Sequence, residues 1–199
     1  MWRGERCLFR DLCVQVHGAR ALHVRGANGS GKTTLLRILC GLLTPEDGHL
    51  LVAGDRVRGA DPRLRALVGY LGHADGLKLD LAVVENLLFA AALTGVSPLP
   101  DPVAILTRVG LAHLAALETR HLSAGQRRRL AIGRLLGGGH RVWILDEPFT
   151  ALDAQGDELL CQLLEHALDG GVGVVFTSHQ HPPLRAGRLD VLDLDRAPA

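Results

Sequence analysis

The stretch GANGSGKT, residues 26–33, constrains the fold of this chain more than any other feature. It fits the pattern GxxxxGK[ST] and lies between a short apolar segment, ALHV at 21–24, and an apolar helical pattern, KTTLLRILCGLL at 32–43. Glycines let backbone N–H groups turn inward around phosphate oxygens, where a Cβ would block the approach. We therefore predict a strand, a phosphate-binding loop and a helix ending near Gly41.

The residue types in this loop predict a nucleoside triphosphate with Mg²⁺. Lys32 is placed to reach the β- and γ-phosphates, and the Thr33 hydroxyl is placed to hold Mg²⁺. The helix that opens at Lys32 adds the positive end of its dipole. The predicted ATP-binding residues are Gly26, Ala27, Asn28, Gly29, Ser30, Gly31, Lys32, Thr33 and Thr34.

A second chemical feature is VWILDEP at 142–148, where an apolar strand ends in two carboxylates. We expect Asp146 to join Thr33 as a Mg²⁺ ligand. Glu147 is then the candidate that orients and polarises the attacking water. Two acids before a proline also suit an ordinary solvated strand end, but the phosphate loop favours the catalytic interpretation.

A third candidate is His179, which ends the strand pattern VVFTSH at 174–179. An imidazole at a strand end could donate a hydrogen bond to a γ-phosphate and sense its loss. A lone histidine in this place is more often a packed or solvated residue. Together with the other elements it is, with Glu147, a predicted catalytic residue.

The order of predicted elements indicates an α/β fold. Further strands are expected at 49–57, with Gly54-Asp55 as a break, at 65–71, and at 188–194 as an edge strand. Helical patterns cover 79–110 and 153–168. Near-continuous apolar strands alternating with helices predict a mostly parallel sheet covered by helices. We predict one domain over 1–199, with a helical subdomain inserted at about 79–138.

Composition narrows the function classes. The formal net charge of +1 argues against nucleic acid as the main partner. The ten histidines are scattered, so no metal cluster is expected, and Cys40 and Cys161 are expected to be buried, reduced thiols. No signal peptide is recognised near Met1, and no apolar run is long enough to span a bilayer. The chain is expected to be soluble, with any membrane role supplied by a partner.

The stretch HLSAGQRRRL at 121–130 contains neither a metal site nor a nucleophile with its base. Its LSAGQ resembles the signature motif of the nucleotide-binding subunits of ABC transporters, and the resemblance covers nearly the whole chain. It implies a P-loop NTPase fold with a RecA-like parallel-sheet core and a small antiparallel β subdomain. It also implies a head-to-tail homodimer in which the signature of one subunit caps the ATP of the other. The signature residues are Leu122, Ser123, Ala124, Gly125 and Gln126.

Other motifs of that family occur in the expected order. TALD at 150–153 resembles the D-loop, which implies Asp153 at the dimer interface. The Q-loop position, usually glutamine, is His73. Because imidazole suits Mg²⁺ poorly, we expect His73 to act through water or at the contact with a membrane subunit. Arg127, Arg128 and Arg129 are expected to form a solvated face.

The combination of His73 with LSAGQRRR, WILDEPFTALD and TSHQ resembles the ATPase subunit of the cytochrome c maturation, or haem exporter, system. This implies a peripheral subunit at the cytoplasmic face of the bacterial inner membrane. Its expected partners are integral-membrane permease subunits and haem-handling maturation proteins. ATP would drive either haem export or release of the haem-loaded chaperone.

Three other functions remain open from the sequence. They are the ATPase of an exporter for another substrate, an ABC ATPase acting on nucleic acid or the ribosome, and a module that binds ATP without hydrolysing it. At the N-terminus, Trp2 is the nearest aromatic to the place where relatives stack one on adenine, and Arg3 falls roughly at that place. Either Arg3 stacks on the base through its planar guanidinium or the start codon is misassigned.

Overall fold

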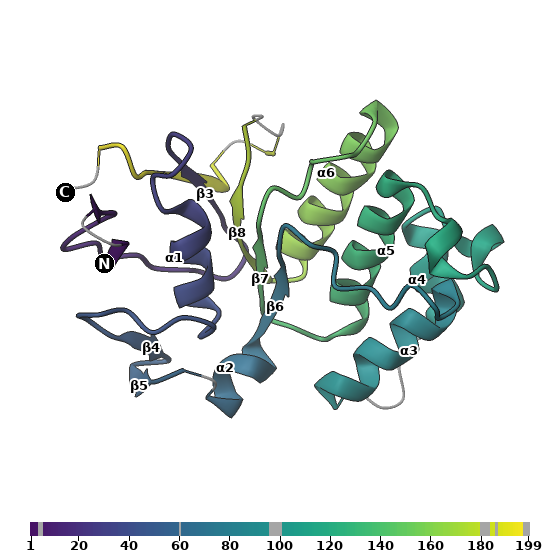
Figure 1. Ribbon diagram of the computed structural model, residues 1–199, viewed down its shortest axis with the longest axis horizontal. Helices are drawn as coiled ribbons and strands as arrows, with labels where there is room; N and C mark the ends of the chain where they lie inside the picture. Colours follow the sequence, from purple (N-terminus) through teal and green to yellow (C-terminus); the bar gives the residue numbers. More distant parts are fainter. Residues whose placement is uncertain (4–5, 60, 96–100, 180–183, 186, 197–199) are drawn as a thin grey trace.

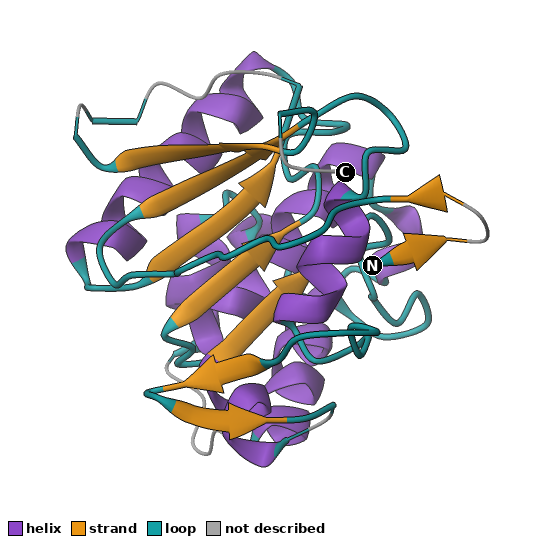
Figure 2. Ribbon diagram, turned by 90° about the vertical axis from the view of Figure 1, so that its left-hand side faces the viewer, coloured by secondary structure: helices purple, strands orange, loops and turns teal. Residues whose placement is uncertain are grey.

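A central parallel sheet organises the computed structural model, which describes residues 1–199 except 4–5, 60, 96–100, 180–183, 186 and 197–199. The strand order is β6-β7-β8-β3-β9, and each neighbouring pair is parallel (Figure 2). The strands are β3 (Ala21–Arg25), β6 (Val68–Leu71), β7 (Val142–Leu145), β8 (Gly173–Thr177) and β9 (Leu189–Asp193). The sheet confirms the predicted P-loop α/β fold, with β9 at an edge.

Helices cover both faces of this sheet (Figure 1). On one face lies α1 (Lys32–Leu39), and on the other lie α5 (Ala124–Gly137) and α6 (Ala154–Asp169). Between β6 and β7 along the chain, α3 (Val83–Thr94) and α4 (Pro102–Arg108) pack on α5. Two short 3₁₀ helices, Ala112–Leu114 and Thr119–His121, lie between α4 and α5.

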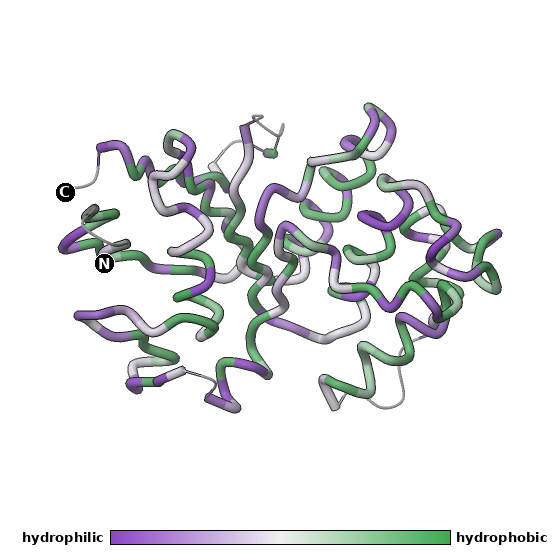
Figure 3. Tube along the Cα trace, in the orientation of Figure 1, coloured by the Kyte–Doolittle hydropathy of each residue, from purple (hydrophilic) through white to green (hydrophobic). Residues whose placement is uncertain are grey.

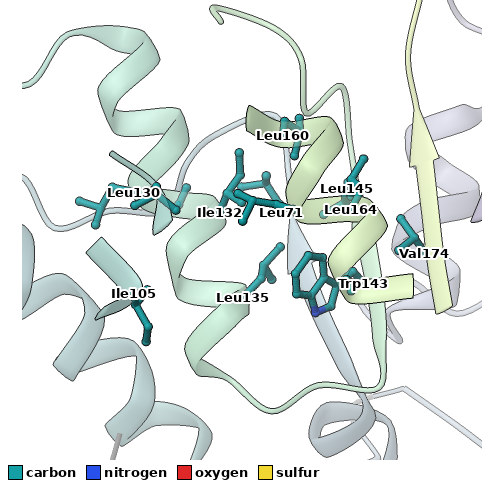
Figure 4. Packing of buried hydrophobic residues seen from close by; sticks show 14 of the residues in the cluster. Leu71, Ile105, Leu130, Ile132, Leu135, Trp143, Leu145, Leu160, Leu164 and Val174 are labelled. Atoms are coloured by element: carbon teal, nitrogen blue, oxygen red, sulfur yellow. The ribbon is translucent and has the colours of Figure 1, made fainter. Parts of the chain in front are cut away.

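The core follows from the alternation of side chains along the strands. In β7, Trp143 and Leu145 join the cluster beneath α5 and α6 (Figure 4), whereas Ile144 joins the cluster beneath α1. In β8, Val175 likewise faces α1. Figure 3 shows the hydrophobic residues gathered along these central strands. Burying each large apolar side chain contributes about 1.5–3 kcal/mol, so both faces of the sheet need helical cover.

Two antiparallel hairpins lie outside the sheet. They are formed by β1 (Trp2–Arg3) with β2 (Arg6–Cys7) and by β4 (Leu50–Val52) with β5 (Asp55–Val57). The turn between β4 and β5 is Ala53-Gly54, with φ of 51° and 91°, which matches a hairpin turn needing two positive φ angles. The turn therefore lies one residue earlier than the break predicted at Gly54-Asp55.

The strand predicted at 65–71 is wrong in its first half. Residues Pro62–Leu67 form the short helix α2, and the strand begins only at Val68. The Asp61 carboxylate accepts a 2.9 Å hydrogen bond from the Arg63 backbone N–H, and proline occupies the first turn of the helix. An aspartate before a proline is a helix-start signal, and the apolar residues that follow it obscured this signal.

The thiols are less buried than predicted. Cys40 and Cys161 are both only partly buried, and all four cysteines are free. Cys40 is the C-cap residue of α1 and Cys161 lies within α6, so apolar neighbours along the sequence do not by themselves decide how deeply each thiol is buried. Over the described residues, no helix is both long and apolar enough to span a lipid bilayer.

Candidate functional site

The phosphate loop, residues 26–31, joins β3 to α1 in a conformation that requires glycine. Gly26 has φ 145°, and a Cβ there would lie 2.4 Å from the Ser30 Oγ. Gly31 has φ 101° and is the N-cap of α1. Lys32 Nζ donates hydrogen bonds of 2.8 and 3.1 Å to the carbonyls of Gly26 and Ala27, so its side chain lies across the loop. The loop is thus closed by its own lysine.

The Asp146 carboxylate connects the phosphate loop to the sheet. It is 3% exposed at the end of β7. Its Oδ2 accepts a 2.9 Å hydrogen bond from the Thr33 hydroxyl, and its Oδ1 accepts a 2.8 Å hydrogen bond from the Thr177 hydroxyl. A hydroxyl and a carboxylate in contact are the oxygen donors that suit Mg²⁺. The donor set therefore fits the cation predicted from the sequence.

Glu147 is held in an unusual backbone conformation beside His179. Its φ of 49° lies in the left-handed region, which is costly for a residue other than glycine. Its backbone N–H donates a 2.8 Å hydrogen bond to the Thr177 hydroxyl. Its Oε1 lies 3.6 Å from His179 Nε2, and the two side chains are 22% and 69% exposed. The two predicted catalytic residues therefore meet at the carboxyl ends of the neighbouring strands β7 and β8.

These groups surround one open cleft at the carboxyl ends of the strands, where ligands of open α/β sheets generally bind. Three predicted loop residues do not line the cleft. The carbonyls of Gly26 and Ala27 accept hydrogen bonds from Lys32, and Ser30 is buried. The cleft is lined by Leu8, Asn28, Gly29, Gly31, Lys32, Thr33, Thr34, Asp146, Glu147 and His179.

The signature residues 122–126 lie outside this cleft. Ser123 is the N-cap of α5, and its hydroxyl accepts a 3.1 Å hydrogen bond from the Gln126 backbone N–H. Gln126 Oε1 accepts a 2.8 Å hydrogen bond from the Ser123 N–H, which completes a capping box. Because α5 and α1 lie on opposite faces of the sheet (Figure 1), the structure does not bring the signature and phosphate loop of one chain together.

The signature and the predicted D-loop are neighbours within the chain. A Cβ at Gly125 would lie 3.0 Å from the Ala151 carbonyl oxygen, a tight contact that favours glycine there. Asp153 is the N-cap of α6 and accepts a 2.8 Å hydrogen bond from the Gly156 N–H. His73 is exposed in the segment after β6 and does not line the cleft.

The prediction that all three arginines form a solvated face is wrong for Arg128. Its side chain is buried against the turn that carries Glu147, where it donates hydrogen bonds to the carbonyls of Asp146 and Glu147. Periodicity could have indicated this, because Arg128 shares a helix face with the buried residues Ala131 and Leu135.

The sequence interpretation also missed Thr177, which is fully buried and bridges Asp146 to the Glu147 backbone. A threonine that follows the apolar residues of a buried strand was the available signal. A buried hydroxyl is costly without partners, so its presence there implied a bonding role.

The charge of Asp146 affects groups beyond the cleft. Burial, with Asp146 as the second cause, raises the pKa of the Cys40 thiol to about 12. Burial, followed by the charge of Asp146, also raises the pKa of the Tyr70 hydroxyl. Such a buried negative charge favours a cation at its oxygens.

Comparison with known proteins identifies the class. Residues 9–150 match the ABC transporter family, and the chain belongs to this family. It shares 49% identity over 178 residues with the cytochrome c biogenesis ATP-binding export protein CcmA of Nitrosococcus oceani, covering 89% of this chain and 81% of the relative. The protein of the same name in Aromatoleum aromaticum is 44% identical over 200 residues, covering 99% and 92%.

Solved structures agree on the fold. An ATP-binding subunit of an ABC transporter has a TM-score of 0.81 at 22% identity, covering 96% of this chain and 82% of its own. A dimeric ATP-binding cassette in a post-hydrolysis state with ADP and Pi also has a TM-score of 0.81, at 23% identity, covering 95% and 89%. The family match and the curated relatives show that the chain is an ABC-type ATPase subunit, as the phosphate loop and the resemblance of the signature predicted.

Proposed function

We propose that this chain is the ATPase subunit of a membrane complex that serves c-type cytochrome biogenesis. The observation that carries the ATPase chemistry is the chain of hydrogen bonds that links Thr33, Asp146, Thr177 and Glu147 at the mouth of the phosphate loop. The pathway is supported by relatives at 40–49% identity that carry the cytochrome c biogenesis name.

In this proposal Thr33 and Asp146 hold Mg²⁺. When bound, Mg²⁺ neutralises charge on the β- and γ-phosphate oxygens. Lys32 exchanges its two loop carbonyls, 2.8 and 3.1 Å away, for phosphate oxygens. Loop N–H groups and the N-terminus of α1 bind the remaining phosphate charge.

Glu147 and His179 act on the attacking water and on the γ-phosphate. The carboxylate of Glu147 faces the cleft from a rigid turn, so it can accept a hydrogen bond from water and orient it for in-line attack. His179, with its Nε2 3.6 Å from Glu147 Oε1, donates to the γ-phosphate and senses its departure. Neither group forms a covalent bond with the nucleotide.

We also propose that two copies of the chain share their sites head to tail. The N-terminus of α5 with exposed Ser123 then faces the γ-phosphate of the second copy, and Asp153 lies at the interface between copies. Support comes from the position of α5 on the face of the sheet opposite α1. ATP bridging both copies binds the closed dimer better than the open one, and hydrolysis reverses this preference.

The membrane partner is proposed to dock on a groove between α2–β6 and α3–α5, with residues 79–138 acting as the helical subdomain. Leu93 and Leu42 line this groove and are 69% and 63% exposed. Contiguous exposed apolar surface marks interaction sites, and two exposed leucines that line one groove are compatible with such a surface. His73 lies in the segment 72–76 next to this groove, and Asp75 of the same segment lines the groove. The place of the subunit at the cytoplasmic face of the inner membrane is proposed from the cytochrome c biogenesis export name of the relatives.

Gene deletion tests the pathway. The host gene is deleted and restored with wild type or with Lys32→Ala, and membranes are stained for covalently bound haem. Loss of c-type cytochromes that only wild type restores supports the proposal. Normal c-type cytochromes in the deletion strain, with the ATPase intact in vitro, favour an exporter of another substrate.

A further inference from the structure

The Arg128 guanidinium uses all three of its nitrogens in five hydrogen bonds, two of them buried and three part-buried. Arginine has five donors in a rigid fork. The five acceptors, with their distances, are the Pro148 carbonyl at 3.3 Å from Nε, the Gly72 carbonyl at 2.9 Å and Asp75 Oδ1 at 3.1 Å from Nη1, and the carbonyls of Asp146 and Glu147, both at 2.8 Å from Nη2. A buried charge this well satisfied indicates a specific structural task.

One part of that task concerns the turn that carries Glu147. Three consecutive carbonyls, from Asp146 to Pro148, accept from Arg128, while Thr177 accepts from the Glu147 N–H on the other side. The left-handed φ of 49° at Glu147 persists only if the surroundings hold it. Arg128 and Thr177 supply that restraint from two directions.

The other part concerns the segment 72–76, which contains His73. Arg128 binds the Gly72 carbonyl and the Asp75 carboxylate. Arg134, two turns further along α5, donates to the carbonyls of Asp75 and Gly76 at 3.2 and 2.7 Å. The segment beside the proposed membrane-partner groove is therefore fixed to the same helix that begins at the signature.

We propose that Arg128 is a positioning residue that fixes the carboxylate of Glu147 and ties it to the segment 72–76. The inference rests on the proposed function, because it assumes that Glu147 orients the attacking water. A lysine carries the charge but has three donors at one point, and a glutamine has two, so neither can span both the turn and the segment. Misplacing a catalytic group by about 1 Å costs roughly a hundredfold in rate.

The test compares Arg128→Lys and Arg128→Gln with a matched control, Arg129→Lys, on the next position of α5. The Arg129 guanidinium lies against Gly110, away from the turn. Both Arg128 variants are expected to lower kcat for ATP at least about tenfold while changing the Kd for Mg-ATP less than about threefold. Arg128→Gln also removes the buried charge, so it is expected to fold even if the lysine variant does not. A folded variant with the kcat of wild type overturns the inference.

A double variant separates positioning from general destabilisation. If Arg128 acts through Glu147, then Arg128→Gln added to Glu147→Gln leaves the residual single-turnover rate unchanged within about twofold. A further loss of about tenfold in the double variant contradicts positioning through Glu147. If Glu147→Gln alone keeps wild-type turnover, the proposed function fails; if only the Arg128 variants keep it, the inference alone fails.

Discussion

Thr33 and Asp146 contact each other directly, with the threonine hydroxyl 2.9 Å from Asp146 Oδ2. The contact joins the first turn of α1 to the end of β7, which are separated by more than half of the chain. It brings together the two oxygen donors proposed for Mg²⁺.

Replacing Thr33 with valine is therefore expected to weaken Mg-ATP binding. Valine keeps the shape but removes one oxygen donor, so the affinity for Mg-ATP should fall roughly tenfold or more. The affinity for ATP with EDTA should change much less, because the loop N–H groups and Lys32 remain. Isothermal titration with and without Mg²⁺ measures both values, and Thr33→Ser is the control. An equal loss in the two conditions would contradict the assignment of Thr33.

Thr177→Val tests the hydroxyl that bridges Asp146 and Glu147. The change leaves the Glu147 N–H without its acceptor and Asp146 Oδ1 without a donor in a buried place. Each loss costs about 1–3 kcal/mol, so both the free energy of unfolding and kcat should fall. Thr177→Ser keeps the hydroxyl and should retain most of kcat. Chemical denaturation and a phosphate-release assay measure the two effects; a valine variant as active as the serine variant would remove Thr177 from the site.

Two glycines with positive φ separate backbone strain from close packing. Gly41 ends the α1 region with φ 69°, and a Cβ there would lie 2.3 Å from the Gly59 carbonyl oxygen. Gly54 has φ 91° with open space around it. We expect Gly54→Ala to cost about 1–3 kcal/mol from strain alone and Gly41→Ala to cost more. Urea denaturation gives both values, and equal costs would mean that the Gly59 contact is easily relieved.

The main fold features could be predicted because each has a local cause. The phosphate loop needs its glycines, and the strands that lead to Asp146 and His179 are marked by apolar runs. The helix at Pro62–Leu67 was missed because its start signal, Asp61 before a proline, precedes residues that also suit a strand. In that segment two local preferences compete, and the helix start at Asp61 and Pro62 prevails up to Leu67.

Arg128 and Thr177 could not be assigned their roles from local patterns. Their partners are 18 to 56 residues away for Arg128 and 30 to 31 residues away for Thr177. A charged residue beside two others suggests a solvated face. Helical periodicity places the middle arginine on the buried face, but only the packing of α5 on the β7 turn shows which carbonyls it binds. The left-handed backbone of Glu147 is likewise a consequence of this packing.

His140 predicts a pH dependence of stability. Burial lowers the pKa of its imidazole, and a hydrogen bond with the Ala66 backbone acts in the opposite direction. Because the fold favours the neutral ring, the unfolded chain binds more protons than the folded chain at acid pH. The free energy of unfolding therefore decreases as the pH falls through about 6.5, the ordinary pKa of histidine. His140→Gln should therefore lose less stability than wild type between pH 8 and pH 5.5.

Denaturation at several pH values measures this difference. His113→Gln, at an exposed histidine in a surface 3₁₀ helix, is the matched control and should keep the pH dependence of wild type. A His140→Gln protein with the same dependence as wild type would assign the acid sensitivity to other groups.

The central claim is that the signature of one copy completes the phosphate site of the other, and mixing two inactive variants tests it most directly. Lys32→Ala destroys the phosphate loop, and Ser123→Arg blocks the signature. In a mixed dimer, a shared site unites the intact loop of one copy with the intact signature of the other. We predict that each variant alone is inactive and that an equal mixture recovers roughly a quarter of the wild-type rate, since half of the dimers are mixed and each holds one intact site. Mixed dimers that release no more phosphate than either variant alone would contradict the shared-site account.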